Sequence, residues 1–142
     1  MPSAENSVIV NKPRSEVFDF LADPAENDMK WRPGLLDLTR ASGSGLGAVY
    51  RQGVKGPMGR RIPADIEITA YEENSHIAFK TLGGPVRPEG SYRLEDADGG
   101  TRVTMALSAE LRGFQKLMAP MVAKSMNVQV GALENLKRVL ES

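Results

Sequence analysis

The sequence predicts an α+β protein in which one long C-terminal helix covers a curved antiparallel sheet of about seven strands. Two observations predict this class. Residues 35–111 form a series of segments in which apolar and polar residues alternate, and from residue 114 onward the apolar residues recur at helical spacing. A third observation is the start of the chain, where a short apolar strand precedes two short helices.

The first 34 residues predict a strand followed by two helices. Residues 7–10 favour a strand, and residues 14–22 place their apolar side chains on one side of a helix. Asp23-Pro24 marks the start of the second helix, because aspartate caps helices and proline suits the first helical position. Pro33-Gly34 ends this helix, which is therefore short.

The middle of the chain predicts the rest of the sheet. Ile62, Ala64, Ile66 and Ile68 share one side of a segment whose other side is polar, as in a half-buried antiparallel strand. The pair Asp98-Gly99 is typical of a tight hairpin turn. Strands are expected over residues 35–41, 49–55, 61–72, 76–82, around 92–94, and 102–111.

The closing segment predicts an amphipathic helix. Only this element is long enough to cover the apolar face of the sheet, so we expect the two to pack together. Pro120 lies inside the pattern and either kinks the helix or starts its main segment. The predicted buried face holds Phe114, Leu117, Met118, Met121, Val122, Val128, Ala132, Leu136, Val139 and Leu140.

Composition narrows the function classes. The 142 residues fit one domain, residues 1–142. The absence of cysteine excludes disulfides, thiolate catalysis and cysteine-bound zinc. Basic and acidic residues number 18 each, so net charge does not favour nucleic acid as a partner. The sequence has no recognisable signal peptide and no apolar run of about 20 residues, so we expect a cytoplasmic protein without an integral membrane segment.

Several motifs carry a family resemblance over essentially the whole chain. They are Pro13-x-x-x-Val17-Phe18-Asp19-Phe20-Leu21, Asp23-Pro24, Trp31, Gly47 before Tyr50-Arg51, Gly100-Thr101-Arg102-Val103, and Leu133-x-x-Leu136-Lys137. In their order and spacing the chain resembles the START-like, helix-grip superfamily, and within it the polyketide cyclase/dehydrase-like (SRPBCC) proteins. The resemblance implies a seven-stranded antiparallel sheet that grips a C-terminal helix around an apolar cavity. Members differ in function: some carry lipids, some bind quinones or hormones, and a few catalyse polyketide cyclisation or hydrolysis.

The predicted cavity defines a set of candidate ligand-binding residues. Methionine suits an adaptable apolar site, and Tyr92, Gln129 and Arg51 would orient the polar groups of a ligand. Trp31 either forms a wall of the cavity or fills the core. We expect no metal and no cofactor. The candidates are Trp31, Arg51, Ile66, Phe79, Tyr92, Val103, Met105, Met118, Met121, Val122, Ser125, Met126 and Gln129.

Two polar residues interrupt the apolar face of the closing helix. Burying Ser125 or Gln129 without a partner would cost roughly 1–3 kcal/mol. Either the sheet satisfies them or they face a cavity, and Ser125 can also bond to its own helix backbone. For residues 49–55 the pattern does not decide which face points inward, because either Val49 and Arg51 or Tyr50 and Gln52 could occupy it.

Three functions follow as hypotheses. The first is binding or transport of a small apolar or aromatic ligand, such as a lipid, quinone or polyketide-like compound, by a monomer or homodimer. The second is a cyclase or dehydratase that holds a flexible substrate in a reactive shape, with Tyr92 and Gln129 polarising a carbonyl. No inward pair of carboxylates stands out for acid–base catalysis. The third is a protein-interaction domain whose core is filled.

Overall fold

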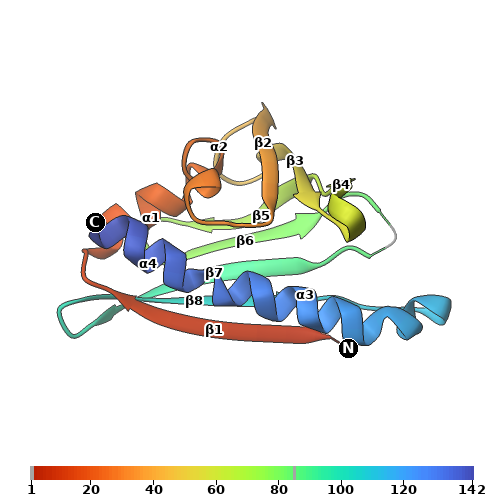
Figure 1. The fold of residues 1–142 in the computed structure, drawn as a ribbon. Helices are drawn as coiled ribbons and strands as arrows, with labels where there is room; N and C mark the ends of the chain where they lie inside the picture. The colour runs from red at the N-terminus through yellow and green to blue at the C-terminus, as the bar shows by residue number, and fades with distance from the viewer. Residues whose placement is uncertain (1, 85) are drawn as a thin grey trace.

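The computed structural model of the protein describes residues 2–84 and 86–142. Its sheet runs β1-β8-β7-β6-β5-β3-β2, with β4 paired to β3, and every neighbouring pair is antiparallel. Figure 1 shows the long C-terminal segment lying along this curled sheet, so the predicted α+β helix-grip fold is confirmed. The strands are β1 (Ser3–Val10), β2 (Leu35–Ser42), β3 (Val49–Lys55), β4 (Arg61–Pro63), β5 (Ile66–Glu72), β6 (His76–Thr81), β7 (Glu89–Ala97) and β8 (Gly100–Ser108).

Two short helices follow β1, and two longer helices close the chain. Pro24 opens α2, as the sequence predicts. Among the described residues, none of the helices has the length and apolar character needed to cross a membrane. The helices are α1 (Arg14–Leu21), α2 (Pro24–Asn27), α3 (Ala119–Gly131) and α4 (Leu133–Glu141), and the shorter 3-10 turns are η1 (Asp28–Lys30), η2 (Pro57–Gly59) and η3 (Gly113–Met118).

Buried and accessible side chains alternate along the strands, and the buried ones form the core on the concave side of the sheet. In β8, Val103, Met105 and Leu107 are buried while the residues between them are more accessible. Strands β7 and β8 are joined by the predicted two-residue turn, because Ala97 pairs with Gly100 across it. Position 100 admits only glycine, since a Cβ there would lie 2.0 Å from the carbonyl oxygen of Val10.

Several strands differ from their predicted bounds. β7 and β8 both begin earlier than predicted, and β8 ends at Ser108 rather than at residue 111. β1 begins at Ser3 rather than at residue 7, because its polar first half pairs in register with β8 from Ser108 onward. The strand predicted over residues 61–72 is divided into β4 and β5. Between them, Asp65 Oδ1 accepts a 3.2 Å hydrogen bond from the backbone N–H of Gln52, so a side chain satisfies a donor of β3 at this break.

The C-terminal helical segment is interrupted at Ala132 and not at Pro120. Pro120 lies in the first turn of α3, which agrees with the alternative that it starts the main segment. The interruption comes at Ala132, after Gly131, a poor helix former. The side-chain amide of Asn6 donates to the carbonyl oxygen of Val130 at 3.0 Å, and so satisfies one of the last carbonyls of α3.

The predicted buried face of this segment is wrong at four positions. Phe114, Leu117, Met121 and Val128 are all exposed. One helical wheel through residues 114–142 assumes a single axis and a constant period. In the structure η3 has the tighter 3-10 period, and the interruption at Ala132 separates α3 from α4.

Candidate functional site

A cavity of about 470 Å³ lies between the concave face of the sheet and α3. Strands β3 to β8 supply most of its wall, and α3 supplies the opposite side. Its lining is predominantly apolar, and four of the methionines contribute to it. They are Met105, Met118, Met121 and Met126.

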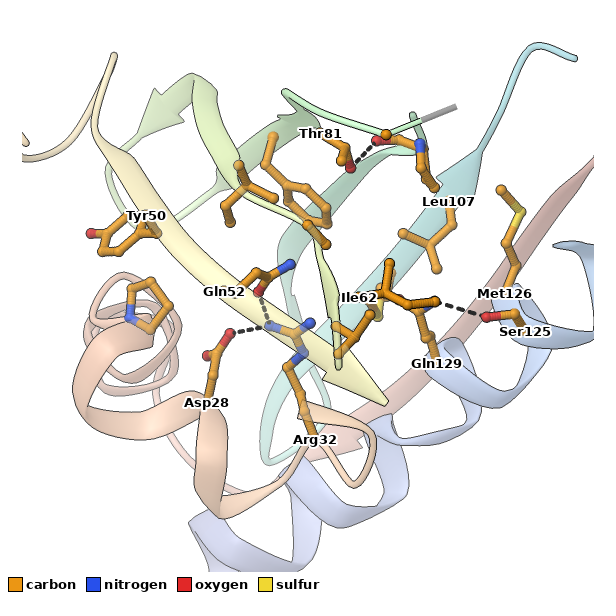
Figure 2. Close-up of a pocket in the computed structure, with 18 of the residues that line it drawn as sticks. Asp28, Arg32, Tyr50, Gln52, Ile62, Thr81, Leu107, Ser125, Met126 and Gln129 are labelled. Atoms are coloured by element: carbon orange, nitrogen blue, oxygen red, sulfur yellow. Dashed lines mark hydrogen bonds and ion pairs between the residues drawn. The ribbon is translucent and has the colours of Figure 1, made fainter. Parts of the chain in front are cut away.

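A cluster of three polar side chains lies at one part of this cavity (Figure 2). Arg32 Nη1 donates to Asp28 Oδ2 at 2.9 Å and to Gln52 Oε1 at 3.2 Å. Asp28 opens η1, and Arg32 follows two residues after its end. The backbone N–H of Arg32 donates to the carbonyl oxygen of Asp28 at 3.0 Å, and this turn places the two side chains on the same side. Gln52 reaches them from β3, so the cluster joins the N-terminal helices to the sheet.

Trp31 fixes this segment against the core. Its side chain is only 2% exposed, and its backbone carbonyl accepts a 3.2 Å hydrogen bond from Asn135 Nδ2 of α4. The indole N–H is buried without a hydrogen-bond partner in the described residues, although the Trp31 side chain still lowers the pKa of the neighbouring Asp28 carboxyl. The contact between Trp31 and Asp28 is therefore favourable but does not have hydrogen-bond geometry.

Burial is the main influence on the Asp28 carboxyl. Loss of hydration raises its pKa above the ordinary 3.8, and the nearby Asp23 carboxyl raises it further by a small amount. The Arg32 guanidinium acts in the opposite direction, through its charge and its hydrogen bond. Burial prevails, so Asp28 takes up a proton more readily than an exposed aspartate.

The Tyr92 side chain lies against two other aromatic rings on the cavity wall. Its ring is edge-on to Trp31 with centroids 6.2 Å apart, and tilted toward Phe79 with centroids 6.1 Å apart. Burial raises the pKa of the Tyr92 hydroxyl, and the charges of Asp28 and Arg32 also act on it. The hydroxyl therefore stays protonated and lies within the electrostatic reach of the polar cluster. It makes no hydrogen bond to any residue in 2–84 or 86–142.

The structure brings ten of the predicted ligand-binding residues to the cavity. They come from four strands, η3 and α3, which lie far apart in the sequence. Their contact with a ligand remains a prediction. The ten are Ile66, Phe79, Tyr92, Met105, Met118, Met121, Val122, Ser125, Met126 and Gln129.

Three predicted residues do not line the cavity. Trp31 fills the core, which decides between its two predicted roles, and Val103 is fully buried beneath the concave face. Arg51 is exposed on the other side of β3, because Tyr50 and Gln52 take the inward positions. The open question of which face of this strand points inward is thereby answered.

Ser125 and Gln129 line the cavity but are not buried. Both are exposed, and Gln129 Nε2 donates to Ser125 Oγ at 3.3 Å one helical turn away. The expected cost of burying them unpaired therefore does not arise. They lie on the accessible side of α3, where both solvent and cavity can reach them.

Sequence reasoning missed Asp28 and Arg32 and left Gln52 undecided. A signal for the first two was present in their four-residue spacing on either side of Trp31. For Gln52 the signal was its shared parity with Tyr50 in residues 49–55.

Such a cavity between a curled antiparallel sheet and a C-terminal helix defines the class of helix-grip proteins. Within this class, the chain belongs to the family described as polyketide cyclase / dehydrase and lipid transport, whose model matches residues 1–141. No curated protein matches the sequence.

Solved structures from several bacteria share the fold. A protein of Thermus thermophilus is 22% identical with a TM-score of 0.77, over 99% of this chain and 94% of that one. A protein of Chromobacterium violaceum is 14% identical with a TM-score of 0.74, over 99% and 97%. A protein of Deinococcus radiodurans is 19% identical with a TM-score of 0.71, over 98% and 97%. At these identities the likeness concerns the fold alone.

Proposed function

We propose that this protein binds a small apolar or aromatic ligand, of the lipid, quinone or polyketide-like kind, between its sheet and α3. The observation that carries the proposal is the cavity of about 470 Å³ with a predominantly apolar lining and the polar cluster of Asp28, Arg32 and Gln52. Ligand sites commonly have volumes of about 300–1,000 Å³ and this kind of lining. A domain with a filled core would lack this space, which favours binding over the protein-interaction hypothesis.

Native mass spectrometry of the freshly purified protein tests the proposal. We expect a bound small molecule that denaturing extraction releases, and a rise in melting temperature when apolar ligands are added. The variant Val122→Trp is the matched control, because it places a large side chain in the cavity wall. Ligand-free protein with no thermal shift across an apolar library would contradict the proposal.

A second candidate, a cyclase- or dehydratase-type enzyme, is favoured by one specific observation. Asp28 is a buried carboxyl with a raised pKa, and it lines the cavity beside a guanidinium. Such a group can act as a general base toward a bound substrate. In this proposal Tyr92, which stays protonated, donates a hydrogen bond to the substrate, and Gln129 contacts it from the accessible side.

Deuterium incorporation into acetophenone, followed by NMR in heavy water, tests this candidate without knowledge of the natural substrate. Asp28 would take a proton from the methyl carbon and leave an enolate. It would exchange that proton for a deuteron of the heavy water and then donate the deuteron to the same carbon. We expect exchange in the wild type and its loss in Asp28→Asn. The control is Asp19→Asn, which changes an exposed carboxyl of α1. Equal exchange in wild type and Asp28→Asn would exclude this role of Asp28.

A further inference from the structure

The polar cluster of the cavity has more hydrogen-bond donors than its own acceptors use. A guanidinium carries five N–H groups, two of them on Nη1. Arg32 Nη1 uses its two for Asp28 and Gln52. The N–H groups on Nε and Nη2 make no hydrogen bond to the described residues, so this cavity-lining side chain keeps donors for another partner.

The orientation of the Gln52 amide follows from its contact with Arg32. Because a guanidinium only donates hydrogen bonds, the amide oxygen must be the atom that faces it. The amide nitrogen is therefore the amide atom farther from Arg32 Nη1, as Figure 2 shows. Gln52 is only 5% exposed, and its NH2 group makes no hydrogen bond to residues 2–84 or 86–142. A buried amide with two free donors faces the cavity.

The backbone holds this amide in place. The N–H of Gln52 donates to Asp65 Oδ1 at 3.2 Å, and its carbonyl oxygen accepts from the N–H of Ala64 at 2.9 Å. These bonds join Gln52 of β3 to Ala64 and Asp65, the two residues between β4 and β5. The donors of Gln52 and Arg32 are thus positioned before any ligand arrives, which lowers the entropic cost of binding.

The charges of Asp28 and Arg32 determine which kind of ligand acceptor the free donors favour. Asp28 and Arg32 form a neutral pair in a largely apolar surrounding. A carboxylate ligand would add a second negative charge beside Asp28, and an unbalanced buried charge is costly. An uncharged carbonyl oxygen can accept from the same donors without this cost.

We infer that Arg32 and Gln52 form a subsite for the oxygen of an uncharged carbonyl compound, a ketone or quinone, whose apolar part fills the rest of the cavity. The inference rests on the proposed function and names the ligand class for it. The guanidinium and the amide donate to one carbonyl oxygen, and Asp28 keeps the guanidinium in position. Carboxylates of the same shape are bound more weakly.

Three probes of similar shape test the subsite: benzophenone, diphenylmethane and diphenylacetate. Hydrogen bonds from charged groups raise affinity by about tenfold or more. We therefore expect benzophenone to bind roughly tenfold or more tightly than diphenylmethane, and diphenylacetate to bind most weakly at neutral pH. The infrared carbonyl stretch of bound benzophenone should lie below its frequency in hexane, because hydrogen bonds lower it.

The variant Gln52→Leu removes the amide donors at nearly constant size. We expect it to weaken benzophenone, to leave diphenylmethane unchanged, and to shift the carbonyl stretch back toward its hexane value. The control is Arg51→Leu, which changes the neighbouring exposed side chain of β3. The infrared measurement on the wild type tests the subsite even where Gln52→Leu fails to fold.

The outcomes separate the two proposals. Equal binding of benzophenone and diphenylmethane, or tighter binding of diphenylacetate, would overturn the carbonyl subsite while leaving the binding function intact. An unshifted carbonyl stretch would overturn it as well. If none of the three probes binds, the proposed binding function fails and the subsite fails with it.

Discussion

The two halves of the C-terminal helix differ in how firmly they are held. In α4, Leu133 and Leu136 have no exposed surface, and in α3 only Met126 and Val130 are buried. The α3 half lines the cavity, and α4 contributes no residue to that lining. One half of the helix thus stabilises the fold, while the other half leaves room for a ligand.

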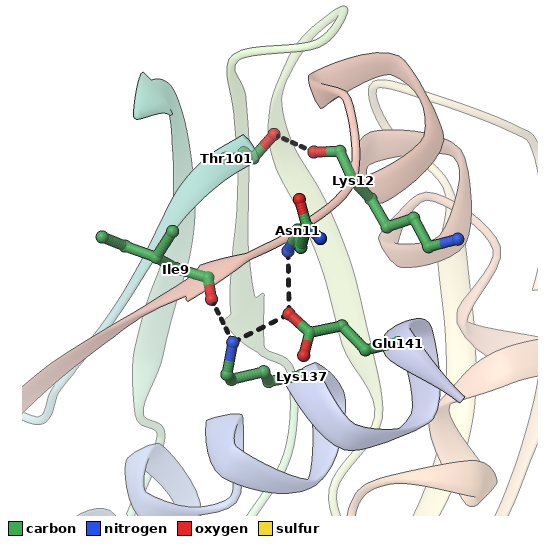
Figure 3. A network of polar contacts seen from close by, with 6 residues as sticks. All are labelled: Ile9, Asn11, Lys12, Thr101, Lys137 and Glu141. Carbon is green, nitrogen blue, oxygen red and sulfur yellow. Dashed lines mark hydrogen bonds and ion pairs between the residues drawn. The ribbon is translucent and has the colours of Figure 1, made fainter. Parts of the chain in front are cut away.

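Polar contacts reinforce this difference (Figure 3). Lys137 Nζ donates to the carbonyl oxygen of Ile9 at 2.6 Å and pairs with Glu141 at 2.8 Å. Glu141 Oε2 in turn accepts from the backbone N–H of Asn11 at 2.8 Å, where β1 has just ended. These contacts join α4 to the end of β1, so the chain is fixed at the end of the sheet opposite η3.

Truncation of an apolar side chain in each half gives the largest expected contrast. Leu136→Ala should lower the free energy of unfolding by about 2–5 kcal/mol, because it leaves a cavity in the core. Met121 is 55% exposed, so Met121→Ala should change stability by about 0.5 kcal/mol or less. Urea denaturation measures both. Equal losses would contradict the distinction between the two halves.

Enlarging a valine in each half sharpens the comparison. Both valines pack against the core, but only Val122 also lines the cavity. Val139→Trp therefore has no space to fill and should destabilise the protein by about 1–3 kcal/mol. Val122→Trp extends into the cavity and should lower ligand affinity tenfold or more with a smaller loss of stability. Melting curves and titration with an apolar fluorescent probe separate the two effects. A Val122→Trp protein that unfolds as readily as Val139→Trp would show that α3 is as tightly packed as α4.

The comparison also explains what the sequence could predict. The sheet, the two short N-terminal helices and the closing helix follow from local patterns, because alternation and helical spacing are properties of neighbouring residues. The buried face of α4 was predicted correctly at Leu136 for the same reason. At Phe114 and Val128 the wheel failed, since helical spacing does not indicate whether a cavity or solvent lies opposite.

The polar cluster shows the second limit. Asp28 and Arg32 are ordinary charged residues at the start of η1 and just after its end, and neither is unusual in the sequence. Their role in the site depends on Gln52, which joins them only through the pairing of β3 in the sheet. The same pairing turns Arg51 outward. The local sequence could not predict this, because both alternating sets of residues 49–55 contain a residue suited to the core.

The junction between the halves should have an intermediate effect. Asn6→Ala removes the side-chain donor to the Val130 carbonyl, and we expect a loss of about 0.5–1.5 kcal/mol. Amide hydrogen exchange should increase mainly in α3, whose last turn loses this bond. The control Ser7→Ala changes the next residue of β1, which is exposed. Exchange that increases equally in α3 and α4 would contradict a junction at Ala132.

The smallest expected effect concerns pH and the polar anchor of α4. The hydrogen bond from Lys137, followed by that from the Asn11 backbone, lowers the pKa of Glu141 below 4.5. Because the folded-state pKa is the lower one, Glu141 stabilises the fold above pH 4.5 and loses this contribution as the pH falls through its folded-state pKa. Glu141→Gln should therefore be less stable than the wild type at neutral pH, and the difference should shrink on acidification.

Urea denaturation over a series of pH values measures this difference. Asp37→Asn is the matched control, because Arg61 lowers the pKa of Asp37 in the same way at the opposite end of the sheet from β1. In Asp37→Asn, the free energy of unfolding should still fall on acidification by the amount that Glu141 contributes. A stability gap between wild type and Glu141→Gln that stays constant from neutral to acidic pH would mean that the charge of Glu141 does not hold α4 on β1.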